Sequence, residues 1–61
     1  SSDLDDPELL ALIQRKYQNA FNCSKEIAEF IFKKYTYAVS SEEIIYLTVH
    51  IHRLIYMDEG R

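Results

Sequence analysis

The sequence has little of the residues that usually break helices or staple small domains. It contains one cysteine, Cys23, so no disulfide bond can form within the chain. Its one proline, Pro7, and its one glycine, Gly60, stand near the two ends, and residues 8–59 contain neither. Because hairpins and tight turns usually use these residues, their absence favours long helices over a sheet of short strands.

The net charge and the lengths of the apolar runs exclude further classes of protein. The 61 residues carry ten acids against seven bases, a net charge of −3, so no basic face is expected and we predict no direct contact with nucleic acid. No apolar run approaches the ~18 residues of a membrane span, and no signal peptide is visible, so we expect a cytoplasmic protein that does not enter membranes. A lone cysteine is consistent with a reducing compartment.

A first helix is predicted over about 7–35. Asp6 can act as its N-cap, Pro7 suits the first helical position, and Glu8 suits the positive end of the helix dipole. Apolar residues then recur at helical spacing at Leu10, Ile13, Tyr17, Phe21, Ala28, Ile31 and Tyr35. The helical spacing of these apolar residues continues across Asn22-Cys23-Ser24, which favours one continuous helix. The alternative is a break there, with Ser24 capping a second helix.

A second helix is predicted over about 41–57, after a connection at 36–39. Ser40 followed by Glu43 forms a capping box, in which each side chain binds a free backbone amide of the other residue. We expect residues 58–61 to fray. The predicted fold is therefore all-α: an antiparallel helical hairpin.

The segment Tyr46 to Leu54 also has the composition of a strand, with His50 and His52 alternating in it. A strand would direct both imidazoles to one face, where they could bind zinc. The capping box and the spacing of Ile44, Leu47, Ile51 and Leu54 favour a helix instead. On a helix the two histidines are about 200° apart and cannot chelate one metal ion. We predict no metal and no cofactor.

The second helix is apolar on nearly all sides, with Ile44, Leu47, Ile51 and Leu54 on one side and Ile45, Val49 and Tyr56 on another. A helix of this kind is buried on several sides. Because the first helix can cover only one of them, we predict that the hairpin is part of a helical bundle completed by homodimerisation.

His50 is the candidate functional residue. Spacing alone favours a histidine packed against a neighbouring helix and leaves open a second reading, a phosphoryl acceptor whose new charge would reorganise a helix interface. Glu43, Tyr46 and Arg53 share its face: Glu43 or Tyr46 could orient the imidazole, and Arg53 could pair with phosphate. His52 faces elsewhere and is expected to be structural or exposed, and Cys23 is expected to be a small packed residue. No catalytic set appears, so we predict that the chain is not an enzyme.

The stretch "SSEEIIYLTVHIHRL", Ser40 to Leu54, resembles the closing helix of the phosphotransferase-system regulation domain, the PRD. The family pattern is an acidic residue, an aliphatic, Tyr-Leu, a small or polar residue, an aliphatic, His and Ile. Here it runs from Glu43 to Ile51. The segment Pro7 to Tyr35 is similar to the long helix before that motif.

The resemblance implies a regulatory domain of BglG-type transcriptional antiterminators. Such domains are phosphorylated on histidines by the phosphotransferase phosphocarriers, HPr and enzyme II, and phosphorylation shifts their dimerisation. The family histidine aligns with His50. Because a full domain has about 100 residues, residues 1–61 would be its carboxy-terminal portion. The alternative is a helical dimerisation module without phosphoacceptor chemistry.

Overall fold

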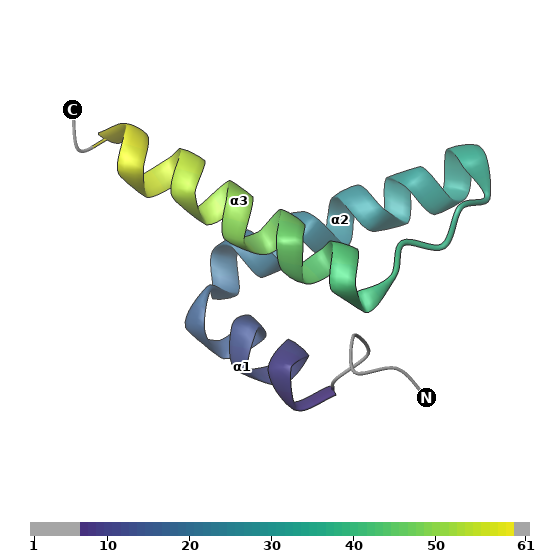
Figure 1. The fold of residues 1–61 in the computed structure, drawn as a ribbon. Helices are drawn as coiled ribbons and strands as arrows, with labels where there is room; N and C mark the ends of the chain where they lie inside the picture. Colours follow the sequence, from purple (N-terminus) through teal and green to yellow (C-terminus); the bar gives the residue numbers. More distant parts are fainter. Residues whose placement is uncertain (1–6, 60–61) are drawn as a thin grey trace.

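The computed structural model describes residues 7–59, with side chains described as far as Tyr56. Over these residues the chain is all-α, with three helices and no strand: α1 (Pro7–Lys16), α2 (Gln18–Tyr35) and α3 (Ser41–Glu59). Figure 1 shows α2 and α3 crossing near their middles, with α1 turned back beneath them. The helical prediction for Tyr46 to Leu54 is therefore confirmed, and the strand alternative is wrong.

The prediction of one continuous helix over 7–35 is wrong, and so is the alternative break at Asn22-Ser24. The chain breaks at Tyr17, whose φ of −124° and ψ of 59° lie outside the helical region. The break loses little hydrogen bonding, because the Tyr17 amide still donates to Ile13 O at 2.9 Å and its carbonyl still accepts from the Phe21 amide at 2.7 Å. The hairpin becomes a three-helix arrangement.

Packing explains why the break occurs. In a straight helix Ile13 and Phe21 would lie about 12 Å apart along the axis. In the structure both belong to one buried cluster with Ile44 of α3. Because α1 turns back at Tyr17, the side chains of Ile13 and Phe21 can both pack against Ile44. No glycine or proline marks this corner, so local sequence could not locate it.

Two hydroxyl groups occupy the crossing of α2 and α3. Ser24 and Thr48 are both fully buried. The Ser24 hydroxyl donates to Ala20 O at 3.1 Å and accepts from the Thr48 hydroxyl at 3.0 Å, while Thr48 Oγ1 also lies 2.7 Å from Ile44 O. Thr48 has one proton to donate, so it serves one acceptor at a time. The small side chains Ala20 and Ser24 let the two backbones approach closely.

The ends of α2 and α3 follow local rules. Thr36 closes α2 in the left-handed conformation, with φ 57° and ψ 31°, and its amide donates to Phe32 O. At the start of α3 the predicted capping box is confirmed: the Ser40 amide donates to Glu43 Oε1 at 2.9 Å, and the Glu43 amide donates to Ser40 Oγ at 3.2 Å. Glu59 ends α3 two residues beyond the predicted Met57 (59 − 57 = 2). Asp6 and residues 60–61 lie outside the described residues.

Much apolar surface stays exposed. α3 continues well past its crossing with α2 (Figure 1). On this helix Leu54, Ile55 and Tyr56 are exposed. On α2, Phe30, Phe32 and Tyr35 are exposed as well. Within residues 7–59, none of the helices combines the length and the hydropathy needed to cross a bilayer.

The buried hydroxyl pair generates a prediction. Thr48→Val keeps the shape of the side chain and removes its hydroxyl, so the hydrogen bond to Ser24 is lost while Ser24 still donates to Ala20 O. We expect urea unfolding to show a loss of about 1 kcal/mol. Ser24→Leu should cost more, about 1–3 kcal/mol, because it forces the helices apart. If Thr48→Val were as stable as the wild type, the hydroxyl pair would not hold the crossing together.

Candidate functional site

His50 lies on the outward side of α3, in an exposed position. Its imidazole stacks on Tyr46, one turn earlier, with ring centroids 5.9 Å apart and planes 9° from parallel. Tyr46 itself is 70% exposed. The contact therefore holds the imidazole against a ring at the surface and leaves it open to a partner.

Glu43, two turns before His50, belongs to the start of the helix. Its carboxylate accepts from the Tyr37 hydroxyl at 2.9 Å and 3.1 Å and from the Ser40 amide at 2.9 Å. The Ser40 amide bond, then the Tyr37 hydroxyl bond, lower the pKa of Glu43, and in return Glu43 raises the pKa of Tyr37. Of the two residues predicted to orient His50, Tyr46 is the one in ring contact with it. The sequence did not indicate a role for Tyr37, because its hydrogen bond to Glu43 spans the connection between α2 and α3.

Arg53 completes the predicted set. It is exposed, one turn after His50 on the same side of α3. The helix thus places Tyr46, His50 and Arg53 in line along its outer face, with Glu43 at the head of that line.

His52 occupies a different environment. Its ring centroid lies 4.3 Å from that of Tyr17 at the α1–α2 corner and 4.7 Å from that of Tyr56 on α3. The side chain is half-buried. The two histidines therefore diverge as predicted, and His52 joins α3 to the corner of the other two helices. Nothing in the sequence near Tyr17 indicated this contact.

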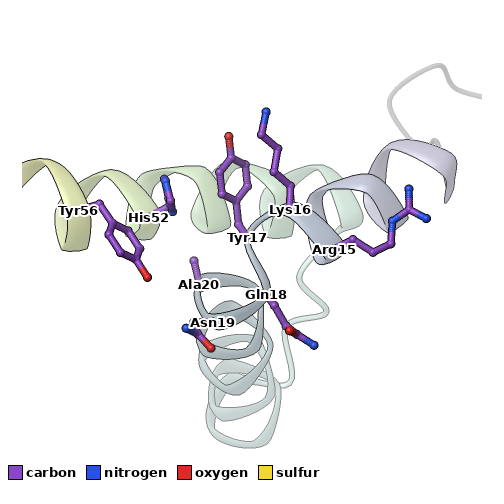
Figure 2. Close-up of a pocket in the computed structure, with 8 residues that line it drawn as sticks. All are labelled: Arg15, Lys16, Tyr17, Gln18, Asn19, Ala20, His52 and Tyr56. Atoms are coloured by element: carbon purple, nitrogen blue, oxygen red, sulfur yellow. The ribbon is translucent and has the colours of Figure 1, made fainter.

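An open hollow of about 230 Å³ lies at this corner, between His52, Tyr56 and the first turn of α2. Figure 2 shows that the side chains around it diverge: Lys16 and Tyr17 point to one side, Gln18 points to the other, and Arg15 points away from His52. The Lys16 ammonium lies over the Tyr17 ring, 5.5 Å from its centroid. Because the basic groups do not converge, the hollow has no built anion site.

Cys23 corrects one expectation. It was predicted to be a packed residue, and its side chain is exposed on α2. The reason is the rotation of α2, which turns Ala20 and Ser24 towards α3 and Cys23 outward. Among the described residues, no three side chains of the metal-binding types gather in one place.

Comparison with known proteins agrees with this architecture. The family model of the PRD domain matches residues 2–54, which is most of the chain and includes His50. The chain therefore belongs to the PRD family, a regulatory and non-enzymatic class of domain that is regulated by components of the phosphotransferase system.

Two curated relatives are antiterminators. The chain is 38% identical over 50 residues to "Transcription antiterminator LicT" of Bacillus subtilis (strain 168), and 32% identical over 50 residues to "Beta-glucoside operon antiterminator" of Dickeya chrysanthemi. Each alignment covers 82% of this chain and 18% of the relative. The chain thus spans about a fifth of the length of these relatives. No solved structure matches it.

The environments of the two histidines predict that substituting them changes stability by different amounts. His52→Ala removes a half-buried ring between two tyrosines and should lower the free energy of unfolding by about 1–2 kcal/mol. His50→Ala removes an exposed ring and should stay within about 0.5 kcal/mol of the wild type. Urea unfolding of both variants measures the difference. Equal effects would contradict the placement of the two rings.

The Glu43 contacts predict a pH dependence. Because the folded state lowers the pKa of Glu43 from its ordinary 4.5, its contribution to stability is present above that value and is lost as the pH falls towards the folded pKa. Glu43→Gln keeps a capping side chain but cannot titrate. We expect the difference in melting temperature between wild type and Glu43→Gln to shrink below about pH 4.5. Tyr37→Phe removes the hydroxyl donor and should weaken this pH dependence. If the melting-temperature difference between wild type and Glu43→Gln stayed constant down to pH 2, the predicted role of Glu43 would be wrong.

Proposed function

We propose that this chain is a phosphoacceptor segment of a transcriptional antiterminator, with His50 as the phosphorylated residue. The observation that carries the proposal is the exposure of His50 in a chain of the PRD family. His52 is held between two aromatic rings, whereas His50 presents its ring at the surface with Arg53 one turn away. The more exposed His50 ring is the easier of the two for a phosphocarrier to reach.

The transfer is a simple displacement at phosphorus. The lone pair of the unprotonated His50 nitrogen forms the new nitrogen–phosphorus bond, and the donor group keeps the electron pair of the bond that breaks. The donor takes up the proton that the phosphorylated ring releases. Tyr46 limits the rotation of the imidazole by stacking on it, and Arg53 balances part of the added charge. The donors we propose are the phosphocarriers HPr and enzyme II.

Phosphorylation acts, in this proposal, by shifting homodimerisation. The exposed apolar residues of α2 and α3 supply surface for association, and a new dianion on α3 changes its electrostatics. Residues 1–61 are the carboxy-terminal portion of the domain, the protein is cytoplasmic, and nucleic acid is bound by another part of it. A plain dimerisation module without chemistry is the second candidate, because the same apolar residues support it equally well.

A labelling experiment separates the two candidates. The full-length parent protein is incubated with the phosphotransferase phosphocarriers, and acid-labile phosphate is mapped by mass spectrometry. We expect the phosphate on His50 to disappear in His50→Ala and to persist in His52→Gln, the matched control. If the wild-type segment carries no acid-labile phosphate, the dimerisation module is the correct assignment. If the label persists in His50→Ala and is lost in His52→Gln, the acceptor is His52 and the assignment of His50 is wrong.

A further inference from the structure

The corner between α1 and α2 is a hinge of one residue. Tyr17 alone separates the two helices. Apolar side chains nevertheless keep helical spacing through the corner, since Ile13, Tyr17 and Phe21 stand four residues apart. No glycine or proline is near, so the local sequence favours a helix that runs straight on. The bend therefore depends on contacts with α3.

Few contacts hold α1 in the bent position. Of the ten residues of α1, Ile13 alone is buried, and most of the others are exposed. Ile13 packs in the cluster that contains Ile44 of α3. The second contact lies at the hinge itself, where the ring centroids of Tyr17 and His52 are 4.3 Å apart. One aliphatic side chain and one pair of rings thus keep α1 against α3.

A straight helix would gain hydrogen bonds that the bent form lacks. Amides in the first turn of a helix have no intrahelical acceptor, and Tyr17 gives α2 no side-chain cap. In a helix continued through Tyr17, the amides of Gln18, Asn19 and Ala20 would donate to the carbonyls four residues before them, at the end of α1. Tyr17 loses nothing, because its amide and its carbonyl already make their helical bonds. The gain in hydrogen bonds opposes the loss of packing.

We propose that the Tyr17 corner is a conformational switch, in which α1 leaves α3 and joins α2 in one helix over residues 7–35. His52 is its latch, because the His52 ring lies between Tyr17 and Tyr56 and ties α3 to the hinge residue. In the straight form Ile44 loses the cover of Ile13, so the side of α3 that faces α1 becomes accessible. The switch is a property of the fold and is independent of the proposed phosphorylation.

Gln18→Pro should lock the bent form. At the first position of a helix a proline costs no hydrogen bond, and it disfavours helical torsions at the residue before it. That residue is Tyr17, which is already outside the helical region. In the straight helix the same proline would stand in the interior and break it. Gln18 is exposed, so no packing is lost, and Gln18→Ala is the matched control.

The distance between two spin labels measures the switch. The labels are attached at Ala11→Cys and Lys33→Cys, two exposed positions, in the whole chain carrying Cys23→Ser. In a straight helix these positions share one side and lie about 33 Å apart along the axis. In the bent form the distance is shorter, because α1 turns back beneath α2 and α3 (Figure 1). Double electron–electron resonance separates the two populations.

Removing the latch should shift the populations. We expect His52→Ala to raise the ratio of the long to the short distance by roughly three- to tenfold, the range that corresponds to aromatic contacts of this kind. Adding Gln18→Pro to His52→Ala should restore the short distance, and adding Gln18→Ala should not. If wild type and His52→Ala both show the short distance alone, or if the long distance persists with the proline, the proposal is wrong.

Circular dichroism distinguishes straightening from unfolding, which could also lengthen the distance. Straightening brings Tyr17 and the first amides of α2 into a continuous helix, so the helical signal of His52→Ala should equal or exceed that of the wild type. Unfolding lowers that signal. A helical signal that falls as the long distance appears would overturn the switch.

Discussion

The crossing of α2 and α3 at Ser24 and Thr48 determines how the rest of the molecule is presented. Both hydroxyl groups are fully buried: Ser24 donates to Ala20 O, and Thr48 has the Ser24 hydroxyl and Ile44 O as alternative acceptors. Thr48 faces α2, and its hydroxyl lies 3.0 Å from that of Ser24. This contact accompanies the observed rotation of α3 about its axis. His50, two residues on, then points outward, and His52, one turn on, points towards the corner of the other helices.

The corner at Tyr17 is the second consequence of that rotation. With α3 oriented by Thr48, Ile44 becomes the residue on which α1 and α2 must both pack, and α1 turns back to place Ile13 there beside Phe21. Tyr17 then lies against His52, whose other neighbour is Tyr56. One histidine thus contributes to the packing of three helices, while the other is exposed at the surface.

The contrast between a packed histidine and an exposed one is compatible with a regulatory domain. The core consists of a few side chains, and much apolar surface on α2 and α3 remains exposed. A modification on an exposed helix face can change association without disturbing the crossing beneath it. The PRD family, to which the chain belongs, is regulated by the phosphotransferase system, and a surface histidine above a well-bonded helix pair is compatible with regulation of this kind.

The helical class, the start of α3 at the Ser40–Glu43 capping box and the divergence of the two histidines could all be predicted from the sequence. They follow from local hydrogen bonding and from the 100° turn per residue, which need no knowledge of neighbours. The resemblance to the PRD rests instead on the residue pattern from Glu43 to Ile51. Only the tertiary structure decided the break at Tyr17, the exposure of Cys23 and the Tyr37 bond to Glu43. Each depends on contacts between residues on different elements, and the helical phase of the apolar residues continues through Tyr17 as though the helix were unbroken.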